Sequence, residues 1–111
     1  MAQYLFQAAY TSEAWNTMAN NPQDRAKAVE SAIENLGGSV KNFWLSFGDY
    51  DIIGVIEMPD SVAAAAFSMA VAAGGACKSV RTTPLLSTAE GVEAMKMAAT
   101  CGYHPARKAT A

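Results

Sequence analysis

The chain is short of charge. Charged residues make up 16% of its 111 residues and hydrophobic residues 51%, whereas an average soluble domain is roughly a quarter charged. So few charges indicate that more of the surface is covered than in a monomer, and self-association explains this most simply. The net charge is −2 with eight Lys and Arg. Because phosphate binding needs a clustered basic face, nucleic acid is not expected as a partner.

Histidine, cysteine and long apolar runs are scarce as well. His104 is the only histidine, and Cys77 and Cys101 have neither metal-knuckle nor Cys-x-x-Cys spacing. We therefore expect no metal, no cofactor and free thiols in a cytoplasmic protein. The most apolar window, Val62 to Ala76, is too short to cross a bilayer, and no secretory signal opens the chain, so no membrane is expected as a partner.

Strand-like and helix-like patterns alternate along the chain. Strands are predicted over residues 3–10, 39–47, 51–58 and 77–83. Helices are predicted from Thr11 or Ser12 through Met18, from Pro22 behind an Asn21 cap to Leu36, from Ser61 to Ala73, and from a Ser87 cap to about Thr100. This order predicts an α+β, ferredoxin-like βαββαβ fold with an antiparallel four-stranded sheet and an extra C-terminal helix. We expect one domain over residues 1–100 and a polar tail over 101–111.

Two helices can cover only one face of such a sheet. The central strand 51–58 is nevertheless apolar on both faces, with Ile53 and Val55 on one side and Ile52 and Ile56 on the other. The uncovered face needs a partner, and a second copy of the chain is the simplest one. The helix over residues 61–73 is apolar all round, which predicts burial on every side.

Strict alternation assigns the side chains of the second strand to two faces. One face receives Lys41, Phe43, Leu45 and Phe47, and the other receives Val40, Asn42, Trp44 and Ser46. Gly48-Asp49 then supplies a hairpin turn in which Gly48 can adopt a positive φ. Pro59-Asp60 ends the next strand and caps the helix that follows.

Phe47-Gly48-Asp49-Tyr50-Asp51, followed by Glu57-Met58-Pro59-Asp60, joins a turn, a strand and a helix start. These residues resemble the hallmark of the GYD domain family, named for its Gly-x-Tyr-Asp turn. The resemblance covers roughly residues 3–90, with further matches at Tyr10-Thr11, Arg25, Gly37-Gly38 and Val80-Arg81-Thr82-Thr83. It implies a dimeric α+β barrel in which two sheets face each other, and it brings no agreed enzymatic activity.

Six side chains are candidates for ligand binding: Asp49, Tyr50, Asp51, Trp15, Arg25 and Glu57. The turn that holds the first three either presents them to a ligand near Arg25 or serves structure alone. Trp15 either lines an aromatic pocket or packs in the core. Glu57 faces the partner sheet, where a carboxylate needs an ion-pair partner such as Arg81 or Arg25, or acts as a general acid or base.

Three functions remain open on these grounds. The first is a small homo-oligomer that binds a small ligand or a protein partner. The second is a cofactor-independent oxygenase or cyclase, as in other dimeric α+β barrels, with Trp15 as substrate wall, Tyr50 as hydrogen-bond donor, Arg25 as anion anchor and Glu57 as base. The third is a structural or assembly subunit that docks through the final helix, which carries Met95 and Met97.

Overall fold

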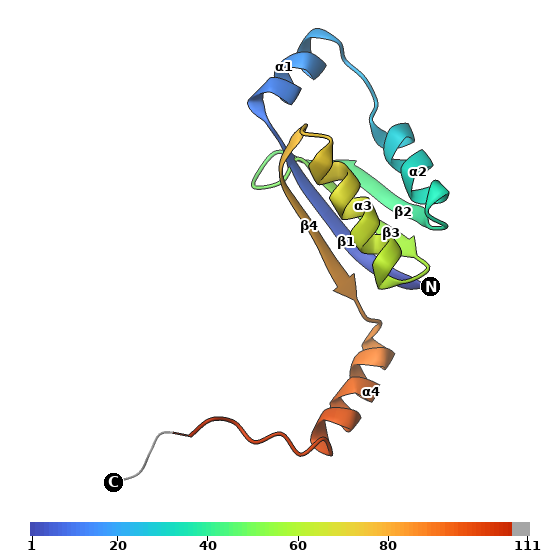
Figure 1. The fold of residues 1–111 in the computed structure, drawn as a ribbon, viewed down its shortest axis with the longest axis vertical. Coiled ribbons are helices and arrows are strands. Elements are labelled where there is room, and N and C mark those ends of the chain that lie inside the picture. The colour runs from blue at the N-terminus through green and yellow to red at the C-terminus, as the bar shows by residue number, and fades with distance from the viewer. Residues whose placement is uncertain (108–111) are drawn as a thin grey trace.

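The computed structural model describes residues 1–107 and arranges its elements around one sheet (Figure 1). Their bounds are β1 (Ala2–Tyr10), α1 (Ser12–Asn20), α2 (Ala26–Asn35), β2 (Ser39–Leu45), β3 (Ile52–Met58), α3 (Ser61–Ala73), β4 (Cys77–Leu85) and α4 (Thr88–Ala99). Residues 101–107 of the predicted tail form neither helix nor strand. Residues 108–111, the rest of that tail, lie outside the described part of the chain.

The sheet is antiparallel throughout, in the order β2-β3-β1-β4. The ferredoxin-like prediction is therefore confirmed, with β1 and β3 central and β2 and β4 at the edges. Helices α2 and α3 cover one face (Figure 1). The core lies between them and that face; its buried members are Tyr4, Phe6, Ala8, Tyr10, Ile33, Ile52, Ile56, Met58, Ala64 and Phe67. The rings of Phe6 and Phe67 lie 4.9 Å apart, and burying each contributes about 1.5–3 kcal/mol.

Capping side chains fix most of the helix starts. The Thr11 hydroxyl accepts a hydrogen bond from the Ala14 amide at 3.0 Å, and the Asp60 carboxylate accepts one from the Ala63 amide at 2.8 Å. Ser87 and Glu90 form the predicted capping box at α4.

The start of α2 is four residues later than predicted, at Ala26 rather than Pro22. The Asn21 amide donates to the Thr17 carbonyl at 3.0 Å and so closes α1. Asn21 is thus the C-cap of α1 and not the N-cap of α2. Asp24 satisfies a backbone donor at the start of α2, because its carboxylate accepts a hydrogen bond from the Ala26 amide at 2.8 Å.

A β-bulge corrects the predicted faces of β2. The register against β3 shifts between Val40 and Asn42, which makes Lys41 an extra residue. Val40 and Phe43 consequently both pack on the core, whereas Lys41 reaches Glu57 on the opposite face. The strand ends at Leu45, and the turn that follows does not use a positive φ at Gly48.

The predicted burial of α3 and the predicted end of β4 were also wrong. Helix α3 buries only Ala64 and Phe67 and leaves Val62 76% exposed, because nothing in this single chain covers the outer side of the helix layer. Strand β4 continues through Pro84, opposite Tyr4, to Leu85. Proline is tolerated there because β4 is an edge strand.

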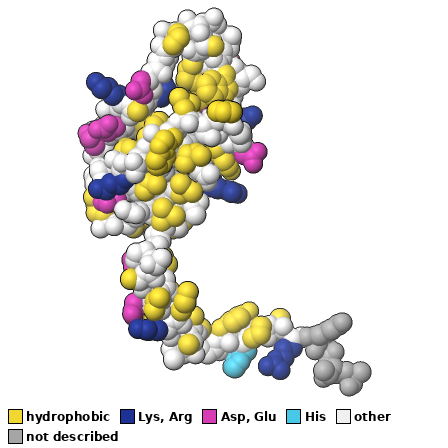
Figure 2. Space-filling model, turned by 180° about the vertical axis from the view of Figure 1, so that it is seen from behind, with side chains coloured by type: hydrophobic (Ala, Val, Ile, Leu, Met, Phe, Trp, Pro, Cys, Tyr) yellow, Lys and Arg dark blue, Asp and Glu magenta, His cyan; other side chains and the backbone are white. Residues whose placement is uncertain are grey.

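The second face of the sheet has no helix over it. Figure 2 shows hydrophobic side chains gathered over this face, with charged groups toward its rim. We call it the open face; strand pairing places Leu5, Gln7, Ile53, Val55 and Trp44 there. Helix α4 leads away from the sheet (Figure 1) and buries none of its residues. Within residues 1–107, no helix has the length and apolar character needed to span a bilayer.

Candidate functional site

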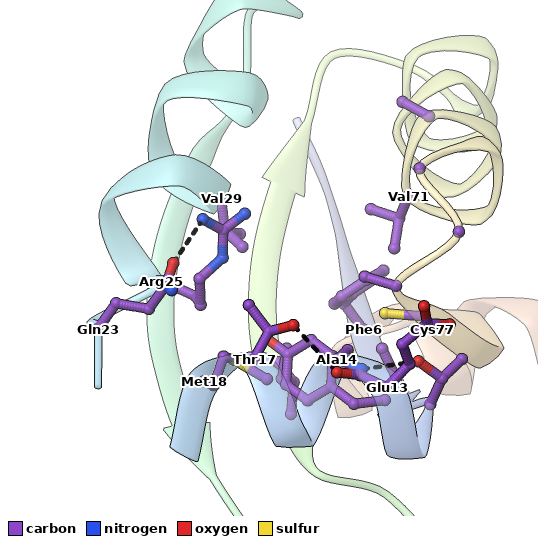
Figure 3. Close-up of a pocket in the computed structure, with 18 residues that line it drawn as sticks. Phe6, Glu13, Ala14, Thr17, Met18, Gln23, Arg25, Val29, Val71 and Cys77 are labelled. Carbon is purple, nitrogen blue, oxygen red and sulfur yellow. Dashed lines mark hydrogen bonds between the residues drawn. The ribbon is translucent and has the colours of Figure 1, made fainter. Parts of the chain in front are cut away.

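A cavity of about 610 Å³ lies between the sheet and helices α1, α2 and α3 (Figure 3). We call it the main cavity. Phe6, Ala8 and Ile52 form its apolar floor, and Val29 and Val71 face it from α2 and α3. Its polar or ionisable lining side chains come from four segments: Tyr10, Thr11, Glu13, Thr17, Gln23, Arg25 and Cys77. The space is thus mostly apolar, with a few polar groups at its margin.

A second cavity of about 440 Å³ adjoins the first. Trp15, Phe43 and Leu45 line only this second cavity. Five residues line both, and Tyr10 and Arg25 are the ionisable ones among Tyr10, Met18, Gln23, Arg25 and Ile52. These two side chains therefore stand where the two spaces meet.

Arg25 lies in the loop just before α2, and its guanidinium donates to the Gln23 side-chain oxygen at 3.2 Å. This acceptor is a neutral amide oxygen, and the Tyr10 phenol lies within reach of the same guanidinium. A guanidinium carries five N–H donors in a planar fork. Donors thus remain for another acceptor at the cavity edge.

Tyr10 and Cys77 bring two weak acids together where β1 pairs with β4. Burial raises the pKa of the Tyr10 phenol, the Cys77 thiol and the Asp51 carboxylate add to the rise, and Arg25 opposes it. Burial, followed by Asp51, also raises the pKa of the Cys77 thiol. Both groups are therefore protonated at neutral pH, so Tyr10 offers an O–H donor to the cavity.

Asp51 holds this corner of the fold together. One of its carboxylate oxygens accepts from the Tyr10 amide at 2.8 Å and from the Trp15 indole N–H at 3.3 Å. Its own amide donates to the Ala8 carbonyl at 2.9 Å. The Tyr10 and Trp15 rings meet edge to face, with centroids 5.3 Å apart. Asp51 therefore ties α1 to the ends of β1 and β3.

Comparison with known families covers most of the chain. The family model of the GYD domain matches residues 4–95. The chain belongs to the GYD domain family. Searches of curated proteins and of solved structures found no match. All residues that line the two cavities fall inside the GYD domain.

Three of the six predicted site residues of this GYD domain come together. Trp15 and Arg25 line the second cavity, Arg25 lines the main one, and Asp51 bonds to Trp15 beside them. Asp49 is exposed in the turn and Tyr50 is half-buried, and neither lines a cavity.

Glu57 lies at the far end of β3, about 20 Å from Asp51 at ~3.3 Å per residue. It forms an ion pair with Lys41 at 3.4 Å, so the predicted partners, Arg81 and Arg25, were wrong. The bulge explains this, because it turns Lys41 toward the face that Glu57 occupies. The four side chains considered for an enzymatic pocket therefore do not share one cavity.

Tyr10 and Cys77 were not predicted as site residues of the GYD domain. The aromatic end of β1 was the available signal for Tyr10, whereas Cys77, two residues after Gly75, belongs to no motif. Their meeting depends on strand pairing, which local patterns do not reveal. Within residues 1–107, no three His, Cys, Asp or Glu side chains gather closely enough to hold a metal ion.

Proposed function

We propose that this GYD domain acts in the cytoplasm as a homo-oligomer that binds a small organic molecule in the main cavity. The observation that carries the proposal is the cavity itself, about 610 Å³ in volume and apolar at its floor. Pockets for small ligands in proteins are typically about 300–1,000 Å³, mostly apolar, with few polar groups that orient the ligand. The two free thiols, Cys77 and Cys101, suit a reducing compartment.

The open face supports the homo-oligomer. Leu5, Ile53 and Val55 are only half-buried on it, and Trp44 is 51% exposed. A sheet face of this kind is stabilised by packing against a second layer, and a second copy offers a self-complementary one. Pairing through this face leaves the main cavity accessible, because the cavity lies on the other side of the sheet.

The cavity can be tested by filling it. Ala14 is half-buried in α1 and lines the main cavity, so Ala14→Met places a longer side chain inside it. Ala28→Met makes the same change at an exposed position of α2 that lines neither cavity. A fragment library is screened by thermal shift against the unaltered chain and both variants. A ligand present at 100 times its Kd stabilises by about 2.7 kcal/mol, which a melting curve resolves.

We expect fragments that stabilise the unaltered chain and Ala28→Met but not Ala14→Met. The proposal fails if no fragment stabilises the unaltered chain, or if hits stabilise Ala14→Met to the same extent. Melting of each variant without fragments shows that it folds.

A further inference from the structure

We propose that the molecule held in the main cavity is an apolar monocarboxylate whose acid group binds Arg25 and the Tyr10 hydroxyl. This inference rests on the proposed function and names the chemical class of its ligand. It differs from the proposed function because it requires a carboxylate on the ligand, whereas binding of an apolar molecule does not.

Arg25 is the basic residue that lines the main cavity. Its neighbours within the described chain, the Gln23 amide and the Tyr10 phenol, are neutral, and neither is a carboxylate. A guanidinium binds a carboxylate through two parallel N–H···O bonds, which match the planar fork of its donors. The free donors of Arg25 therefore fit the two oxygens of one carboxylate.

Tyr10 adds a neutral donor next to Arg25. The residue is only 7% exposed, and its phenol carries its proton at neutral pH because burial raises its pKa. The phenol and the guanidinium lie close enough for Arg25 to act on that pKa. An O–H donor and a cation side by side can both hydrogen-bond an anionic oxygen of a ligand. These two bonds replace the water that the oxygen loses on binding.

The rest of the lining suits a hydrocarbon body. Phe6 lies at the floor, and Figure 3 shows Val29 and Val71 facing the space from two different helices. Burial of apolar ligand surface against these groups supplies affinity at about 25 cal/mol per Å². A purely polar anion would leave this lining without a partner.

Negative side chains around the site favour a ligand with one negative charge over a ligand with two. Glu13 lines the main cavity from α1, and Asp51 binds the Tyr10 amide just beyond it. Asp24 lines the neighbouring cavity. A second carboxylate or a phosphate dianion on the ligand would approach these groups, and like charges at close range repel.

Three matched probes test the inference on the full chain: 2-naphthoate, its neutral isostere 2-naphthamide, and the dianion naphthalene-2,6-dicarboxylate. Binding is followed by amide NMR shifts at Gly74, Gly75 and Ala76, which line the cavity. We expect 2-naphthoate to bind about tenfold or more tightly than either other probe. Arg25→Gln should remove that preference and leave 2-naphthamide binding unchanged. Arg81→Gln is the control, because Arg81 lies opposite Gln7 on the open face.

Equal binding of 2-naphthoate and 2-naphthamide, or full preference in Arg25→Gln, would overturn the inference and leave ligand binding itself intact. The absence of shifts with all three probes would also overturn it. The fragment screen with Ala14→Met and Ala28→Met then decides separately whether the cavity binds any molecule.

Discussion

Asp51 shows how one carboxylate of the family turn acts through structure. Its oxygen accepts from the Tyr10 amide and the Trp15 indole, so it serves a strand end and a helix together. A backbone amide at a strand end that lacks this acceptor would lose a charge-assisted hydrogen bond. Asp51 of the family's Gly-x-Tyr-Asp turn thus shapes the cavity without lining it.

Asp51→Ala should lower the free energy of unfolding by about 1–3 kcal/mol, because two donors lose their acceptor. Urea unfolding followed by tryptophan fluorescence measures this. Asp49→Ala is the control, since Asp49 is exposed in the same turn and should change stability by no more than about 0.5 kcal/mol. Equal effects of the two substitutions would contradict a structural role specific to Asp51.

Two glycines should respond oppositely to alanine. A Cβ on Gly38 would overlap the backbone carbonyl of Glu57 and crowd Met58, whereas a Cβ on Gly48 meets open space. We expect Gly38→Ala to cost about 1–3 kcal/mol through overpacking. Gly48→Ala should be neutral or stabilise by up to about 1 kcal/mol, because it restricts only the unfolded chain. Thermal melting of both variants checks this, and a severe loss in Gly48→Ala would contradict the open turn.

Stability should fall at alkaline pH. The unfolded chain releases its Cys77 proton near the ordinary thiol value of 9.0 and its Tyr10 proton near the ordinary phenol value of 10.0. The folded chain holds both protons to higher pH, so the unfolded state binds fewer protons in that window. The free energy of unfolding therefore decreases as pH rises above about 9.

Urea unfolding between pH 7 and 10.5 measures this decrease. Tyr10→Phe and Cys77→Ala should each make the slope shallower. Tyr103→Phe, at an exposed position after α4, should leave it unchanged. A slope that is the same in all four proteins would show that other groups cause the decrease.

The order of strands and helices was predictable because its signals are local. Caps such as Asp60 and the Ser87–Glu90 box act within one turn of chain, and apolar spacing separates strands from helices. The bulge at Lys41 was not predictable, because it is defined by the pairing of β2 with β3. The start of α2 was missed because Asn21 has the residue type of an N-cap but serves as the C-cap of α1, which the residue type alone does not reveal.

The candidate site was only partly predictable. Trp15, Arg25 and Asp51 were named from the sequence, since aromatic and charged residues near a turn suggest a site. Tyr10 and Cys77 were missed because they become neighbours only through the pairing of β1 with β4. The cavity depends on how α1 and α2 stand off the sheet, which periodicity does not encode.

Helix α4 should contribute little to the stability of the sheet and its covering helices. None of its residues is buried, and it leads away from the sheet (Figure 1). A chain that ends at Leu86 should unfold within about 1 kcal/mol of the full chain. Urea unfolding at several protein concentrations measures this. A loss above about 2 kcal/mol that grows with concentration would instead show that α4 packs on a second copy.

Self-association through the open face can be tested by a single substitution. Val55 lies half-buried at its centre, opposite Leu5. Val55→Lys should weaken self-association at least about tenfold, because the ammonium would lose water at the interface without an ion-pair partner. Val62→Lys is the matched control on the exposed side of α3. Sedimentation velocity compares the two, with circular dichroism to verify folding, and unchanged association of Val55→Lys would refute pairing through this face.

The alternation of side chains along β1 has a further consequence. Phe6 and Ala8 line the main cavity, while Leu5 and Gln7 lie half-buried on the open face. The same short stretch of backbone would thus touch a guest molecule on one side and a neighbouring protomer on the other. If binding of the guest changes the dissociation constant of the protomers, reciprocity requires that separating the protomers by dilution changes the guest's affinity by the same factor.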